Sequence, residues 1–171
     1  MPQSPWLLMV QQMIFFGAND ACLPGHSQHV PLDRYCENLK LLCCHPSVAA
    51  HDPKIILVTP PPVNEYQLTN RDALERYTTP QRTAANTKKY ADTCRQVGEE
   101  LNLPVVNLWH AFMTRAGWKE GEPLTGSRDV ERSEVLQNLL QDGMRSCKCD
   151  LADIHIFPRL AFQSRRIPPD V

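Results

Sequence analysis

An asparagine at the end of an apolar run is the residue in this sequence best placed to do chemistry. The run Val10–Phe16 is apolar apart from two glutamines, and Gly17-Ala18-Asn19-Asp20 follows it at once. An apolar run that ends in small and polar residues is typical of a buried strand leaving its sheet. In an open parallel sheet, ligands bind at this end of the strands. An Asn19 side chain there can donate an amide N–H to a developing oxyanion, and Gly17 allows close backbone approach.

The composition fits one ordinary globular domain. The chain has 171 residues, of which 42% are apolar and 22% charged, and its formal net charge is −1. This length is enough to bury a substantial core. A balanced charge gives no sign of a nucleic-acid partner or of an anionic membrane surface. We therefore expect neither a nucleic acid nor a membrane as a partner.

The seven cysteines do not form a regular disulfide pattern. Cys43-Cys44-His45 and Cys147-Lys148-Cys149 are conceivable metal ligands, but their spacing fits no usual zinc site. Free cysteines are often simply buried in a core. We interpret them as reduced thiols, with no bound metal, and this favours an intracellular, cytoplasmic location.

The N-terminal stretch has two interpretations. Residues 1–19 contain no charged side chain, as in a secretory signal peptide, but they also lack the basic segment that precedes such an apolar run. The stretch is too short to span a membrane. A buried strand gives the same pattern, and we predict a strand at Val10–Phe16.

Apolar spacing predicts alternating strands and helices along the rest of the chain. Pro31 can open a helix whose apolar residues recur at helical intervals and share one face, namely Leu32, Tyr35, Cys36, Leu39, Leu42 and Cys43. The order strand, helix, strand, helix, strand favours parallel pairing, with right-handed crossovers and helices on both faces of the sheet. We predict a three-layer α/β/α sandwich of the flavodoxin-like kind. The further elements that we expect are a strand at Ile55–Val58, a loop at Thr59–Gln81, a helix at Arg82–Leu101, a strand at Pro104–Leu108, a short helix at Trp109–Ala116 and a charged helix at Ser127–Leu140. In the helix at Arg82–Leu101, the spacing predicts one buried stripe of Tyr90, Cys94, Val97 and Leu101.

Four blocks resemble those of a known enzyme family. They are Ile14–Asp20 with its Gly-x-Asn-Asp ending, Lys54–Pro62, Arg82–Tyr90 and Pro104–Trp109. Together they resemble the SGNH (GDSL-type) ester hydrolases, and in particular the isoamyl-acetate-hydrolysing esterase branch. The resemblance runs from about Met13 to Gly143. It implies that residues 1–143 are a partial esterase domain with the flavodoxin-like SGNH fold, lacking the first strand and the final helix, and that residues 144–171 are an unrelated, irregular tail.

The resemblance also implies roles for individual residues. The family cleaves esters with a serine, a histidine and an aspartate, and an asparagine side chain is one of the donors to the oxyanion. By motif, Asn19 is the oxyanion donor, Gly17 and Asn19 bind the substrate, and Asp142 is the triad aspartate. The substrate of intact relatives would be a small ester, with no metal or organic cofactor. For an isolated asparagine, the alternative is that it merely caps the strand exit.

The sequence departs from the family pattern at two catalytic positions. No Gly-Asp-Ser-Leu-like segment is present, and Ser27 is a poor substitute because His29 stands where an elbow glycine belongs. Arg145 stands where the catalytic histidine is expected, and an arginine cannot accept a proton from a serine. His155 follows Asp153 with a spacing one residue too short to replace it. We therefore expect the chain to be inactive, with Asp142 left as a remnant.

Two hypotheses follow from these departures. A shifted reading frame or an altered splice junction would explain why the resemblance stops at Arg145, and sequencing the transcript tests this. Without a first strand beside it, the Val10–Phe16 strand would be a sheet edge, open to strand pairing or aggregation. The alternative functions are therefore a non-catalytic interaction module that self-associates through this edge, or an unstable product without a role of its own.

Overall fold

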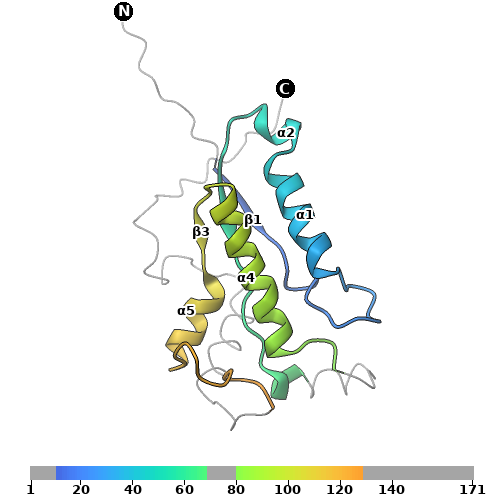
Figure 1. The fold of residues 1–171 in the computed structure, drawn as a ribbon, viewed down its shortest axis with the longest axis vertical. Coiled ribbons are helices and arrows are strands. Elements are labelled where there is room, and N and C mark those ends of the chain that lie inside the picture. The colour runs from blue at the N-terminus through green and yellow to red at the C-terminus, as the bar shows by residue number, and fades with distance from the viewer. Residues whose placement is uncertain (1–10, 69–79, 129–171) are drawn as a thin grey trace, which may run out of the picture.

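A parallel three-stranded sheet forms the centre of the molecule. The computed structural model describes residues 11–68 and 80–128. The strands are β1 (Gln11–Phe15), β2 (Lys54–Val58) and β3 (Val105–Val106), in the order β1-β2-β3. Phe15 is level with Val58, and Val58 is level with Val106, so the C-terminal ends of the three strands form one rim. Figure 1 shows the loops after the strands gathered at this rim, in the lower half of the view.

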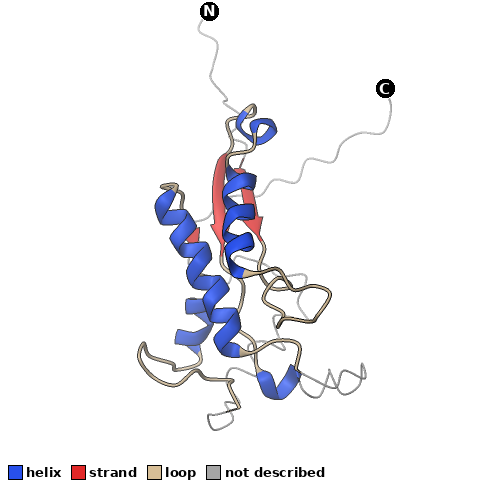
Figure 2. Ribbon diagram, turned by 45° about the vertical axis from the view of Figure 1, so that its right-hand side comes forward, coloured by secondary structure: helices blue, strands red, loops and turns tan. Residues whose placement is uncertain are grey.

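The two long helices lie on one face of the sheet. Helices α1 (Leu32–Cys43) and α4 (Ala84–Glu100) are side by side in Figures 1 and 2 and contact each other. Each crossover moves one strand along the sheet in the same direction, so crossovers of the same hand place both helices on the same face. The predicted layered α/β class with a parallel sheet is confirmed. The described residues supply one helical layer, and the second layer of the expected sandwich is not among them.

The first helix begins where the sequence predicts. Pro31 is the residue before α1, and Tyr35, Leu39 and Cys43 are buried along the expected stripe. Leu42, which we expected on the same face, is 41% exposed. That expectation was wrong because the core covers only the side of α1 that carries Tyr35, Leu39 and Cys43, with Leu32 and Cys36 partly buried beside them. A four-residue helix, α2 (Pro46–Ala49), follows and leads to β2.

Side-chain caps set the starts of the next two helices. The Thr83 side chain accepts a hydrogen bond from the Asn86 backbone N–H and caps α4, which begins at the next residue, Ala84. The predicted stripe of Tyr90, Cys94 and Val97 is buried. Asn107 likewise caps α5 (Leu108–Arg115) by accepting a hydrogen bond from the His110 N–H. Strand β3 therefore ends at Val106, before Leu108, where we predicted its end. Residues 65–68 are also helical, within the segment expected to be a loop.

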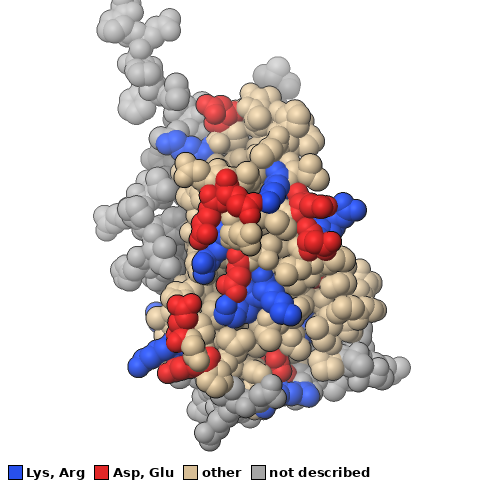
Figure 3. Space-filling model, in the orientation of Figure 1, with Lys and Arg blue, Asp and Glu red and all other residues tan. Residues whose placement is uncertain are grey.

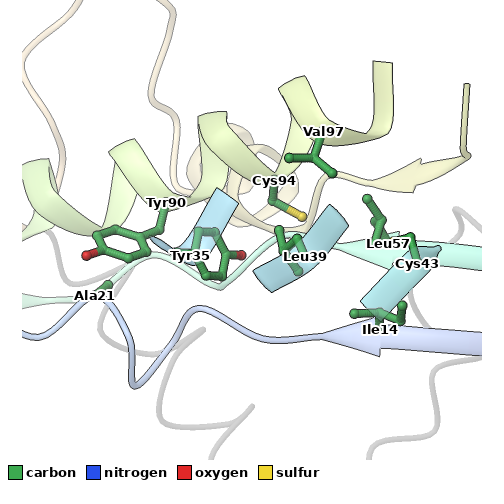
Figure 4. Packing of buried hydrophobic residues seen from close by; sticks show 9 residues of the cluster. All are labelled: Ile14, Ala21, Tyr35, Leu39, Cys43, Leu57, Tyr90, Cys94 and Val97. Carbon is green, nitrogen blue, oxygen red and sulfur yellow. The ribbon is translucent and has the colours of Figure 1, made fainter. Parts of the chain in front are cut away.

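The main core fills the space between the sheet and the two helices. Figure 4 shows Ile14 and Leu57 on the strands, with Tyr35, Leu39 and Cys43 of α1 and the α4 side chains packed over them. The Tyr35 and Tyr90 rings are 5.1 Å apart. A smaller cluster packs α4 against α5 and the residues that follow it. Its members are Ala91, Trp109, Met113 and Trp118, and the rings of Trp109 and Trp118 meet edge to face. These clusters fix α4 over β2 and β3.

The other face of β1 is open. Met13 and Phe15 are each 48% exposed, and Phe16 after the strand is 54% exposed. Among the described residues, β1 pairs only with β2, so its outer edge has no strand beside it. The structure therefore agrees with the expectation that this strand is an edge with exposed apolar side chains.

The helical face carries charges of both signs. Figure 3 shows basic and acidic side chains interspersed over it, with no extended patch of one sign. Lys40 and Glu100 join α1 to α4, and Lys88 and Asp92 pair along α4 at 2.6 Å. Such exposed pairs contribute at most about 1 kcal/mol each. None of the described helices has the length and apolarity that a membrane crossing requires.

Candidate functional site

The turn after β1 presents the predicted site residues at the rim of the sheet. Asp20 folds back so that its carboxylate accepts a 3.0 Å hydrogen bond from the Gly17 N–H. The Ala21 N–H donates to the Gly17 carbonyl at 3.0 Å. The φ angle of Gly17 is +108°, in the region that L side chains rarely adopt. Asp20 thus closes the turn, and Asn19 is left at its exposed outer side.

Gly17 is required by space as well as by its backbone angle. A Cβ atom at this position would lie 2.7 Å from the Tyr35 hydroxyl and 3.1 Å from Pro60 Cγ. The same hydroxyl donates to the Phe16 carbonyl at 3.1 Å. Burial raises the pKa of Tyr35 far above its usual value, so the hydroxyl stays protonated as a donor. The expected close backbone approach at Gly17 is therefore present, toward α1 and the loop after β2.

A buried arginine holds the carboxamide of Asn19. Arg82 is 8% exposed, and its Nη2 donates to Asn19 Oδ1 at 3.0 Å and to Gln28 Oε1 at 3.0 Å. Its Nε donates to the Ala18 carbonyl at 2.8 Å. A guanidinium has only donors, so the oxygen of Asn19 must face it and the Nδ2 group must face away. In the described part of the chain, no acceptor binds Nδ2.

The N-terminal end of α4 holds the same loop at two further points. Asn86 Nδ2 donates to the Ala21 carbonyl at 2.8 Å, and the Leu23 N–H donates to the Gln81 carbonyl at 2.7 Å. Residues 81–86 therefore hold residues 18–23 in place, although the two segments are far apart in the sequence. The sequence analysis missed this role of Arg82 and Asn86. The signal for it was present, because the block Arg82–Tyr90 was one of the four blocks that carried the family resemblance.

The ends of β2 and β3 are joined at the same rim. Thr59 is buried, and its hydroxyl accepts a 3.0 Å hydrogen bond from the Trp109 N–H. The same hydroxyl donates to Asn107 Oδ1 at 3.4 Å. These contacts connect the blocks Lys54–Pro62 and Pro104–Trp109, so all four blocks of the resemblance meet around the C-terminal ends of the strands.

The remaining candidates do not join this site in the described residues. Ser27 is exposed in a turn that follows a loop, which is the wrong setting for a nucleophile elbow. Asp142, Arg145 and His155 lie outside the described residues, so the role of Asp142 stays a prediction. The cysteines within 11–68 and 80–128 are free thiols, and no cluster of three metal-binding side chains occurs there.

Comparisons with known proteins agree with the resemblance. No family model matches the chain. A GDSL esterase/lipase of Arabidopsis thaliana is 35% identical over 121 residues, which are 65% of this chain and 49% of that protein. The mouse isoamyl acetate-hydrolyzing esterase 1 homolog is 35% identical over 99 residues, covering 56% of this chain and 39% of the relative.

One solved structure is also similar. A lipase/acylhydrolase from Enterococcus faecalis is 26% identical with a TM-score of 0.45, covering 78% of this chain and 58% of that one. The chain spans about half the length of the curated relatives that it matches, or less. In sequence, the chain is therefore similar to part of the esterases and lipases of the SGNH (GDSL-type) hydrolase family.

Proposed function

We propose that the rim around Asn19 is the oxyanion side of an ester-hydrolysing site. One observation carries the proposal: the Asn19 carboxamide is exposed at the C-terminal ends of parallel strands, its oxygen is bound by Arg82, and its Nδ2 group meets no acceptor among the described residues. Nδ2 is then a donor that needs no reorganisation when negative charge develops on a bound ester. The names of the relatives, esterases and lipases, support an ester as the substrate class.

We propose that the 171-residue chain by itself does not catalyse ester hydrolysis. They contain no Gly-Asp-Ser-Leu-like segment, and Arg145 stands where the family histidine is expected. One oxyanion donor contributes a rate factor of roughly 10²–10³. Loss of a serine and its base removes a factor of about 10⁶ in the comparable triad of a serine protease. The surviving donor therefore cannot compensate for the missing groups, even if Asp142 keeps its predicted place.

Ester hydrolysis by a completed site tests the proposal. The chain alone should not hydrolyse p-nitrophenyl acetate above the buffer rate. A chimera would join residues 11–143 to flanking segments of the Arabidopsis relative, chosen to supply a Gly-Asp-Ser block and an Asp-x-x-His block. It should show turnover, and Asn19→Ala should lower its kcat by about a hundredfold. Asn102→Ala, an exposed asparagine in the turn after α4, is the matched control and should leave kcat unchanged.

The outcome that contradicts the proposal is equally specific. An active chimera in which Asn19→Ala leaves kcat unchanged would show that Asn19 is only part of the turn after β1. Significant turnover by the unmodified 171 residues would show instead that another group replaces the serine, and Ser27→Ala would then be the next variant.

A second function, as an interaction module, is favoured by the open side of β1. The outer edge of β1 is unpaired among the described residues, and Met13, Phe15 and Phe16 expose apolar surface beside it. A groove of about 370 Å³ lies next to it, at the junction with α1, lined in part by Phe16, Leu41 and Leu42. Unpaired edges and apolar patches are sites of strand addition and association. Sedimentation velocity over a range of concentrations tests this function through the predicted self-association.

A further inference from the structure

Arg82 is a buried cation that has no ionic partner among residues 11–68 and 80–128. It is 8% exposed, and it donates to three uncharged oxygens, on Ala18, Asn19 and Gln28. No carboxylate in the described part of the chain forms an ion pair with it. Removing a charge from water costs several kcal/mol unless it is compensated, so a buried cation that meets only neutral groups is a candidate for a functional role.

The guanidinium fixes which end of the Asn19 carboxamide faces outward. The two ends of an asparagine amide are otherwise nearly equivalent in shape, and only hydrogen bonds distinguish them. Nη2 binds Oδ1 at 3.0 Å, while Nε binds the adjacent Ala18 carbonyl at 2.8 Å. Two donors on one rigid plane hold both the backbone and the side chain of the turn. A lysine has a single ammonium and cannot reproduce this fork.

The same contact places a positive charge behind the proposed oxyanion donor. Charge on the guanidinium polarises the carboxamide through Oδ1 and makes the Nδ2 hydrogens stronger donors. Low exposure of Arg82 reduces the screening of this field by water. An anion that develops beside Nδ2 would therefore meet the amide dipole and the guanidinium charge in the same direction.

We propose that Arg82 is the positioning residue of this site, which fixes the Asn19 carboxamide with Nδ2 outward and supplies a buried positive charge behind it. The inference rests on the proposed function, because positioning has a catalytic meaning only if Asn19 is an oxyanion donor. Its geometric part can be measured without any turnover.

Side-chain NMR relaxation on the ¹⁵N-labelled full chain tests the positioning. In the unmodified chain, the Asn19 Nδ2 group should be as ordered as the backbone, whereas the exposed Asn102 carboxamide, whose side chain makes no hydrogen bond to the described residues, should be mobile. Arg82→Gln and Arg82→Lys should lower the order parameter of Asn19 to that of Asn102. Asn86→Ala removes the neighbouring clamp on Ala21 and is the matched control, which should leave Asn19 ordered.

The result in the unmodified chain already decides the geometric part, even if an Arg82 variant does not fold. An Asn19 carboxamide as mobile as that of Asn102 would overturn the inference. In a folded variant, judged by unchanged backbone resonances of α1 and α4, an ordered Asn19 without Arg82 would overturn it as well. A merely structural role for Arg82 would leave the order of this one carboxamide unaffected.

A titration in Asn19→Asp tests the charge. If a buried guanidinium lies behind position 19, the introduced carboxyl should have a pKa well below the usual range of an aspartate, measured by ¹³C NMR. Adding Arg82→Gln should return it to the usual range. An ordinary pKa in the single variant would overturn the electrostatic part. If the Asn19 carboxamide is ordered but Asn19→Ala leaves the kcat of the chimera unchanged, the proposed function is contradicted and this inference is not. If the carboxamide is mobile but Asn19→Ala lowers the kcat of the chimera, this inference is contradicted and the proposed function is not.

Discussion

The two faces of the sheet differ sharply, although neighbouring residues of one strand form them. In β1, Ile14 is 4% exposed and packs under α1, while Met13 and Phe15 on either side of it are 48% exposed. Successive side chains of a strand point to opposite faces, so this contrast separates the faces themselves. The helical face has a complete local core, and the open face does not.

This difference shows where the proposed site is self-sufficient. The turn that carries Asn19 is held by Arg82 and Asn86 of the α4 block and by the Tyr35 hydroxyl of α1, all within the described chain. The side beyond β1 has only exposed apolar side chains. The proposed oxyanion side of the rim is therefore held by contacts within the described residues of this chain.

The largest expected effect comes from truncating neighbouring residues of β1. Ile14→Ala should lower the free energy of unfolding by about 3 to 4 kcal/mol, because it leaves a cavity under α1. Phe15→Ala, one residue away, should cost less than about 1 kcal/mol, because half of that side chain is already exposed. Urea denaturation measures both. Equal losses would mean that the open face is covered in solution.

A substitution in the turn tests how tightly the rim is packed against α1. Gly17→Ala should cost about 2 to 3 kcal/mol, since it adds a strained φ to a contact of 2.7 Å with the Tyr35 hydroxyl. Gly25→Ala is the matched control, because its φ is +94° but no atom lies within 4 Å of the added Cβ. It should cost about 1 kcal/mol from backbone strain alone. If the two variants unfold at the same urea concentration, the close approach at Gly17 is absent in solution.

Local pattern was enough to predict much of this fold. Apolar spacing predicted α4 and its stripe of Tyr90, Cys94 and Val97, because a helix that covers a sheet repeats its contact every three or four residues. Apolar spacing wrongly predicted that Leu42 is buried, because spacing alone does not show how much of a helix face the neighbouring elements will cover. The one-sided packing of α1 and α4 depends on strand order, which periodicity does not contain.

The same limit applies to the candidate site. The position of Asn19 and Gly17 at the end of β1 was predicted because the apolar run before them and the motif around them are local. The clamp by Arg82 was not predicted, because it joins residues 63 positions apart, and the family resemblance of the block Arg82–Tyr90 did not indicate which residue Arg82 would bind. Asp142 was placed by motif alone, and it lies outside the described residues.

Alkaline pH should weaken the helical face before it affects the open one. Burial raises the pKa of the Cys94 thiol to about 11 from an ordinary value of 9.0. The folded state therefore keeps a proton that the unfolded chain loses, so this contribution is complete below pH 9 and disappears as the pH rises toward 11. The loss at pH 11 should be about 2 kcal/mol. Urea denaturation at both pH values measures it. Cys94→Ala should reduce the dependence, leaving the part that the buried Tyr35 contributes, whereas Cys44→Ala, an exposed thiol, should not reduce it.

The smallest effect on stability, and the most direct test of the open face, comes from adding a charge to it. Phe15→Lys should change the free energy of unfolding by less than about 0.5 kcal/mol, because the side chain is half exposed. It should nevertheless weaken self-association, since a lysine beside an unpaired edge opposes strand addition. Sedimentation velocity at several concentrations measures the association. Ala85→Lys adds the same charge to α4, at an exposed position outside the groove beside β1, and should leave the association unchanged. An equal shift in both variants would indicate a general effect of charge, and the β1 edge would then not be the contact.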